Sequence, residues 1–212
     1  MTEKSAANLG TALLYRTAVL LFCAATLALH LYLTPTSPFL DEGDHANTGW
    51  LLDNGGLMYE HAFNEKGPGL YLITGGLFAL FGPQFQVIRH AATFCMLATL
   101  ILLAILGSLF QSRKSGLFAV ATFFVFHLFS LGKLWQSETV ITPLALSILV
   151  LLFVRSDKAS PSGYRYLMVG LALFIATLIK QTSWILVAAV MLQQGIALRQ
   201  RERTNAPSPI NG

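Results

Sequence analysis

Residues 39–69, FLDEGDHANTGWLLDNGGLMYEHAFNEKGPG, form a long polar stretch in a chain that is otherwise rich in apolar segments. The stretch follows the first apolar segment. It contains six of the ten acidic residues: Asp41, Glu42, Asp44, Asp53, Glu60 and Glu65. Polar stretches between apolar helices are typical of loops at a membrane surface. We therefore expect the flanking helices to hold this loop on one face of a membrane.

The composition of the chain predicts an all-α integral membrane protein. Its 212 residues are 54% hydrophobic and only 11% charged, whereas soluble domains carry about 25% charged residues. The net charge of +4 does not indicate nucleic-acid binding, because the basic residues are scattered in short clusters between apolar segments. Cys23 and Cys95 lie inside apolar segments and are expected to pack as small hydrophobic residues without a disulfide.

The lengths of the apolar segments predict about six transmembrane helices. The first covers residues 11–33, and five follow the polar stretch: residues 87–110, 116–132, 139–154, 164–180 and 183–198. Residues 69–82 are apolar but would rise only about 21 Å as a helix, against a hydrocarbon core of about 30 Å. We expect this segment to be re-entrant or juxtamembrane. Residues 41–53 predict a short helix lying on the membrane, ended by Asn54-Gly55-Gly56.

The positions of the basic residues predict the topology and the domain boundaries. If residues 69–82 do not span and the N-terminus is cytoplasmic, ten of the fourteen lysines and arginines face the cytoplasm, as the positive-inside rule favours. The chain then divides into a cytoplasmic N-terminus (1–10), a transmembrane module (11–198) with an outer loop (34–68), and a basic, disordered cytoplasmic tail (199–212). We expect a multi-pass protein of a bacterial inner (plasma) membrane.

Acidic residues on the outer face are candidate catalytic groups. Asp41 and Glu42 come just after the first helix, so a carboxylate at the membrane surface could take a proton from an acceptor hydroxyl or amine. The alternative is a solvated helix N-terminus, where acids complement the helix dipole. Glu138 is expected on the same face between two spans, and its alternative role is likewise to cap the following helix.

Basic residues at the outer ends of apolar segments are candidate phosphate-binding groups. Lys66 directly precedes a Gly-Pro-Gly bend whose glycines allow the backbone to approach a ligand closely. Arg89 and Lys180 also run against the positive-inside trend, and cations at this depth suit a phosphate. The alternatives are snorkelling and, for Lys66, interfacial anchoring beside a turn.

A divalent cation is a further possibility at the outer face. Asp41 and Glu65 could hold it, with His45 or His61 joining them. The spacing of these residues does not define a metal site, and the alternative is that neither histidine is a ligand. His30, His90 and His127 are expected to be packing or interfacial residues.

Taken in order, these pieces resemble the N-terminal part of a GT-C glycosyltransferase. The resemblance is to the branch that contains protein O-mannosyltransferases, the lipid A aminoarabinose transferase and Rgt-type lipopolysaccharide sugar transferases. The residues that carry it are Asp41-Glu42, Asn54-Gly55-Gly56 with Tyr59, residues 63–69 (FNEKGPG), residues 80–82 (LFG), residues 87–89 (VIR), Ser137-Glu138, and residues 178–181 (LIKQ).

The resemblance implies a membrane enzyme of the cell envelope that transfers a sugar from a polyprenyl-phosphate donor, with inversion, on the non-cytoplasmic face. It implies that Asp41, Glu42 and Glu65 are catalytic, with Asp41 as the base or acceptor-orienting carboxylate. Glu65 would help to hold a metal or the acceptor. The donor phosphate would be bound by Lys66, Arg89 and Lys180, and Glu138 would be the second-loop acid.

Two departures from the family keep other functions open. The family commonly has Lys-Pro-Pro where this chain has Lys66-Gly67-Pro68, and its members are usually longer. We therefore also expect that the chain could be a non-catalytic membrane subunit or remnant that pairs with a partner chain. A small lipid-binding or transport protein is a third possibility.

Overall fold

The computed structural model describes residues 3–33, 40–61, 66–129, 135–154 and 163–205, and their regular secondary structure is entirely helical. The elements are α1 (Glu3–Leu33), α2 (Leu40–Asp53), α3 (Pro68–Phe81), α4 (Phe85–Phe110), α5 (Arg113–Phe129), α6 (Ser137–Phe153), α7 (Gly163–Ile179), the 3₁₀ turn η1 (Gln181–Ser183) and α8 (Trp184–Asn205).

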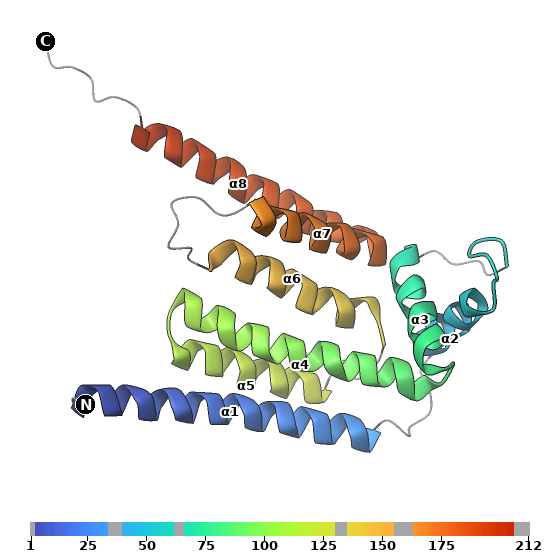
Figure 1. Ribbon diagram of the computed structural model, residues 1–212, viewed down its shortest axis with the longest axis horizontal. Helices are drawn as coiled ribbons and strands as arrows, with labels where there is room; N and C mark the ends of the chain where they lie inside the picture. The colour runs from blue at the N-terminus through green and yellow to red at the C-terminus, as the bar shows by residue number, and fades with distance from the viewer. Residues whose placement is uncertain (1–2, 34–39, 62–65, 130–134, 155–162, 206–212) are drawn as a thin grey trace, which may run out of the picture.

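The long helices lie roughly along one axis, while α2 and α3 gather at one end of them (Figure 1). Helix α4 packs against α1, α5 and α6, and α6 packs against α7. Helix α3 packs on α2 and α7, and it runs across the end of the bundle rather than alongside the other helices. This crosswise placement suits a segment that is too short to span a bilayer.

Among the described residues, two helices are long and apolar enough to cross a membrane: Leu9–Leu33 within α1, and α4. Helices α3, α6 and α7 are apolar but shorter. These helices indicate a membrane protein, and the expectation of about six spans stays a prediction.

Both ends of the chain are more helical than the sequence suggested. Helix α1 begins at Glu3, before the first expected span at residue 11, and α8 continues through residues 199–205, within the expected disordered tail. The physical reason is composition, because alanine, arginine, glutamine and glutamate are all strong helix formers. The last residues, 206–212, lie outside the described part of the chain.

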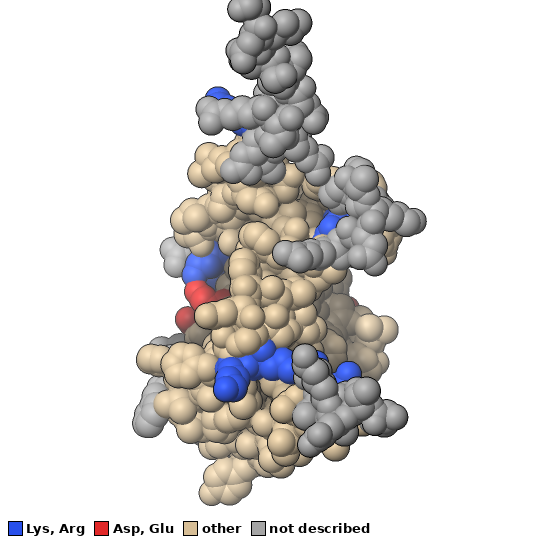
Figure 2. Space-filling model, turned by 90° about the vertical axis from the view of Figure 1, so that its left-hand side faces the viewer, with Lys and Arg blue, Asp and Glu red and all other residues tan. Residues whose placement is uncertain are grey.

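Basic residues collect at the end of the bundle opposite α2 and α3. Helix α4 runs away from α3, so α5 begins at that far end with Arg113 and Lys114, and Arg165 follows near the start of α7. Figure 2 shows lysine and arginine side chains across this end. The charge asymmetry fits the expected cytoplasmic side, because cytoplasmic ends of membrane proteins carry an excess of lysine and arginine.

An apolar core lies beneath the α2–α3 end. It joins Leu70 and Phe78 of α3, Ile88 of α4, Ile179 of α7, and Trp135, which precedes α6. Deeper in the bundle, His30 of α1 contacts Thr93 of α4 through its Nδ1 at 2.9 Å and His127 of α5 through its Nε2 at 2.7 Å. This apolar core supports the end of the bundle at which α2 and α3 lie.

Candidate functional site

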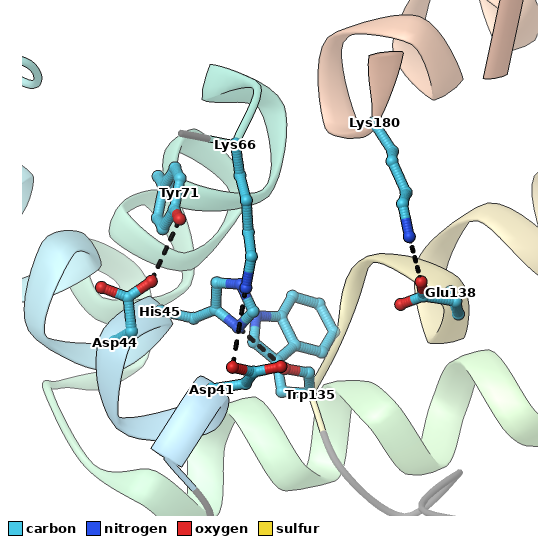
Figure 3. A network of polar contacts seen from close by, with 8 residues as sticks. All are labelled: Asp41, Asp44, His45, Lys66, Tyr71, Trp135, Glu138 and Lys180. Carbon is cyan, nitrogen blue, oxygen red and sulfur yellow. Dashed lines mark hydrogen bonds and ion pairs between the residues drawn. The ribbon is translucent and has the colours of Figure 1, made fainter. Parts of the chain in front are cut away.

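A cavity of about 340 Å³ opens at the α2–α3 end, and we call it the site cavity. Its lining comes from four parts of the chain: Asp41, His45, Lys66, Gly67, Gln136, Ser137, Glu138, Ile179, Lys180, Gln181 and Thr182. The fold therefore brings together Asp41, Lys66, Glu138 and Lys180, which were all predicted site residues (Figure 3). Glu65 lies outside the described residues.

The two adjacent acids of α2 face in different directions. Successive residues on an α-helix point about 100° apart, so one carboxylate can face the cavity while the next faces the core. The Asp41 side chain is 54% exposed and lies 3.8 Å from Lys66 Nζ. Glu42 is fully buried and does not line the site cavity. The structure thus separates the predicted catalytic pair.

Glu42 and Arg89 form a buried ion pair. Arg89 Nε donates to Glu42 Oε1 at 3.1 Å, and Arg89 Nη2 donates to Oε2 at 2.7 Å. Only 6% of the arginine side chain is exposed. A buried arginine that is held in this fork geometry anchors the start of α2 to α4. Because Arg89 pairs with Glu42 and does not line the site cavity, the structure favours a supporting role, and the donor-phosphate role of Arg89 stays a prediction.

Two glycines bring Lys66 next to Lys180. A Cβ atom added to Gly67 would lie 2.4 Å from the carbonyl oxygen of Leu178, and one added to Gly69 would lie 2.7 Å from the backbone of α7. No real side chain fits at such distances, so the Gly-Pro-Gly bend rests directly on the end of α7. The bend approaches the backbone of α7 closely, and the expected approach to a ligand stays a prediction.

Lys180 follows the last residue of α7 and donates a hydrogen bond to Glu138 at the start of α6. Burial by itself would raise the pKa of Glu138, but the hydrogen bond and charge of Lys180 outweigh it and hold that pKa below its usual value. Both side chains are substantially exposed, so the pair is open to exchange with a ligand.

Trp135 connects the helices that line the site cavity, and the sequence interpretation missed it. Its backbone N–H lies 3.4 Å from Glu42 Oε1, and its indole Nε1 donates to Thr74 Oγ1 of α3 at 2.8 Å. Its carbonyl accepts a hydrogen bond from His45 Nδ1 at 3.1 Å. The indole, the backbone N–H and the carbonyl of Trp135 thus all contact α2 or α3, and these contacts hold the following residues 136–138 in place. The local sequence KLWQSE gave no sign of these contacts.

His45 is a buried residue in the wall of the site cavity. Only 1% of the residue is exposed, and burial followed by the Lys66 ammonium lowers the pKa of His45. Its Nε2 is buried without a hydrogen-bond partner in the described part of the chain. His61, the other candidate ligand, is exposed and its Nδ1 accepts from the Leu57 N–H at 3.2 Å.

Two tyrosines support the cavity wall. Tyr59 adopts a left-handed backbone conformation (φ 68°), and its hydroxyl donates to the carbonyl oxygen of Lys66 at 2.9 Å. Tyr71 is fully buried and donates to Asp44 Oδ2 at 3.1 Å, and burial together with the Asp44 carboxylate raises the pKa of Tyr71. The first bond lies within the end of the polar stretch, and the second ties α2 to α3.

The described residues do not by themselves complete a metal site. Among them, no group of three or more histidine, cysteine, aspartate and glutamate side chains is placed to hold a metal ion. Asp41 and His45 share the site cavity, while Glu65 lies outside the described residues. The divalent cation expected at Asp41 and Glu65 stays a prediction, and no chemical step is assigned to it.

An apolar groove of about 410 Å³ leads away from the site cavity, and we call it the tail groove. It shares Glu138, Lys180 and Thr182 with the cavity and is otherwise lined by Ile141, Thr142, Ala145, Leu146, Ser183, Ile185 and Leu186. These residues come from α6, η1 and α8. The tail groove therefore has Lys180 at its head, where it meets the site cavity that Lys66 also lines, and it continues over the apolar surface of α6 and α8.

The family model described as dolichyl-phosphate-mannose-protein mannosyltransferase matches residues 65–209. The chain belongs to this family. The mannosyltransferase family is of the GT-C type, which confirms the resemblance seen in the sequence. No curated protein and no solved structure matches the chain.

The matched region of this mannosyltransferase-family chain contains most of the site cavity. It includes Lys66, Glu138 and Lys180, together with the tail groove. It begins after Asp41 and His45, which the fold nevertheless brings to the same cavity. Family membership and an apolar, all-helical structure together indicate a membrane glycosyltransferase domain.

Proposed function

We propose that this chain transfers a sugar from a polyprenyl-phosphate donor to a lipid, glycan or protein acceptor, with inversion, on the non-cytoplasmic face of the membrane. The observation that carries the proposal is that Lys66 and Lys180 line one cavity, and that this cavity opens at Lys180 into an apolar groove. Family membership supports the same class of donor.

The chemistry of such a transfer matches the site cavity. When the bond between the sugar and the phosphate breaks, its electron pair leaves with the lipid phosphate, and the two ammonium groups would stabilise that charge. The isoprenoid chain would lie in the tail groove, where its burial is favourable. Asp41 would orient the acceptor or take its proton.

Donor binding also has to displace existing contacts. In the structure Lys66 lies near Asp41, and Lys180 is bonded to Glu138. A phosphate is a stronger competitor for an ammonium group than an exposed carboxylate, because it presents several acceptor oxygens. On this proposal, the donor takes both lysines and leaves Asp41 facing the acceptor.

The decisive experiment measures release and transfer of labelled mannose from a mannosyl-phosphate of a polyprenol by membranes that contain the full chain. The wild type should transfer the sugar, and Asp41→Asn should lose most of that activity. Asp53→Asn is the matched control, because Asp53 is an exposed acid at the end of the same helix. Full activity in Asp41→Asn would refute the role of Asp41.

A second experiment tests the tail groove. Ala145→Trp should fill the groove and weaken binding of a long-chain polyprenyl phosphate at least tenfold, while binding of a phosphate with a two-isoprene chain changes little. Val125→Trp, on an exposed position of α5, is the control. Equal loss for both chain lengths would show that the lipid tail does not use this groove.

The expected alternative, a non-catalytic chain that pairs with a partner, predicts a different outcome. Such a chain would bind polyprenyl phosphate but would transfer no sugar until a second membrane chain is added. Co-purification with that chain would distinguish it from the proposed enzyme.

A further inference from the structure

Only one of the two ring nitrogens of the buried His45 has a hydrogen-bond partner in the described part of the chain. Its Nδ1 lies 3.1 Å from the Trp135 carbonyl oxygen, and a carbonyl only accepts, so Nδ1 carries the proton. In the neutral ring, Nε2 then has a lone pair and no hydrogen. This Nε2 is buried and has no hydrogen-bond partner in the described part of the chain. Leaving such an atom unsatisfied destabilises the fold unless a ligand bonds to it.

The surroundings of this lone pair are those of the proposed reaction centre. His45 lines the site cavity together with Asp41, Lys66 and Lys180 (Figure 3). An acceptor that attacks a sugar whose phosphate is held by the two lysines must enter the same cavity. His45 therefore belongs to the wall of the cavity that the acceptor's hydroxyl would have to enter, and its unsatisfied Nε2 is a hydrogen-bond acceptor in that wall.

We propose that His45 Nε2 takes the acceptor's proton during sugar transfer, while Asp41 orients the acceptor. This inference rests on the proposed function. As the acceptor oxygen forms its bond to the anomeric carbon, the bond between that carbon and the phosphate oxygen breaks. The electron pair leaves on the lipid phosphate, and the proton of the hydroxyl moves to Nε2.

The charges around His45 suit this role. The titratable groups near it are Asp41, Asp44 and Glu42 on its own helix, Lys66 and Tyr71 on the α3 side, and Glu138 and Lys180 across the cavity. Burial and Lys66 keep the ring neutral and ready to accept a proton, whereas Asp41 and Asp44 favour the imidazolium once it forms. A donor phosphate that binds Lys66 offsets the unfavourable charge.

The test separates the two nitrogens of the ring. In His45→Asn the amide nitrogen can occupy the place of Nδ1 and keep the bond to Trp135, but no atom replaces Nε2. In proteoliposomes with labelled mannosyl-phosphoryl-polyprenol, release of mannose to water should fall about 10²- to 10⁴-fold. Binding of the unglycosylated polyprenyl phosphate should stay within threefold of wild type. His90→Asn, at an exposed histidine of α4, should match the wild type.

The pH dependence gives a second, independent readout. The rate of the wild type should fall on the acid side as His45 becomes protonated, below the ordinary histidine value of about 6.5. Residual activity of Asp41→Asn should keep this acid limb, and that of His45→Asn should lack it. An active His45→Asn variant with the wild-type limb overturns the inference and leaves the proposed function standing.

The wild type alone decides the question if the asparagine variant does not fold. A rate that stays constant from pH 7 down to the ordinary carboxylate range, about pH 4, overturns the role of His45. A wild type that releases no mannose at any pH overturns the proposed function, and the inference falls with it.

Discussion

Removing the charge of Arg89 should destabilise the whole α2–α3 end of the molecule. In Arg89→Gln, the Glu42 carboxylate stays fully buried and loses two hydrogen bonds of 3.1 and 2.7 Å. Breaking a buried ion pair by removing one partner costs about 3–5 kcal/mol. In a chain of this size each kcal/mol lowers the melting temperature by about 2–4 °C, so the expected loss is roughly 6–20 °C.

The assay is thermal unfolding of the detergent-solubilised protein, followed by the fluorescence of its tryptophans. Glu42→Gln should lower the melting temperature similarly, because it leaves a buried guanidinium unpaired. The double variant Glu42→Gln with Arg89→Gln should lose less than the sum of the two single variants, with a coupling of about 2–3 kcal/mol. Lys180→Gln is the control, because its exposed pair with Glu138 contributes only about 0–1 kcal/mol.

One result would refute this reasoning. If Arg89→Gln unfolds at the wild-type temperature but binds polyprenyl phosphate much more weakly, then Arg89 serves the donor phosphate as the sequence predicted. Additive losses in the double variant would also show that the two side chains do not act as a pair.

Three further changes test how Lys66 and Lys180 are positioned. In Gly67→Ala, the new Cβ would lie 2.4 Å from the carbonyl oxygen of Leu178. Overpacking of this kind costs about 1–3 kcal/mol. Both the melting temperature and the affinity for polyprenyl phosphate should therefore fall. Gly76→Ala in α3 is the control, because its new Cβ meets nothing within 4 Å. If Gly67→Ala keeps the melting temperature and the phosphate affinity as well as Gly76→Ala does, the proposed packing is wrong. Tyr59→Phe removes the hydroxyl that holds the Lys66 carbonyl and should weaken phosphate binding about two- to tenfold without lowering the melting temperature; unchanged binding by calorimetry would show that this bond does not position Lys66. Lys180→Gln should weaken phosphate binding at least tenfold while Glu138→Gln does not, and equal losses in the two variants would assign their effect to the ion pair rather than to the cation.

Much of the fold followed from glycine, proline and the length of apolar segments. The expected short helix 41–53 is α2, and Gly55, with a φ of 79°, ends it as the Asn-Gly-Gly sequence predicted. The expected segment 69–82 is α3, within one residue at each end. These boundaries are local, because a left-handed residue or a proline acts on its own part of the backbone.

The pairing of charges could not be predicted, because it depends on contacts between distant residues. The sequence shows Asp41 and Glu42 side by side, but only the folded arrangement decides which of them is buried against Arg89 of α4. The role of Trp135 is equally hidden, since its three partners come from α2 and α3. The proton on Nδ1 of His45 could not be predicted either, because it is fixed by the carbonyl oxygen of Trp135, which is far away in the sequence.

The contact between the Gly-Pro-Gly bend and the end of α7 has a consequence for how the protein is made. Lys66 is synthesised early, but its partner across the cavity, Lys180, is held in place only when the end of α7 meets Gly67 and Gly69. On the proposed function, the polar stretch would reach its side of the membrane before the phosphate site is complete. A nascent chain would then bind its donor only after synthesis has passed α7, and assembly of the bundle would control when the site is completed.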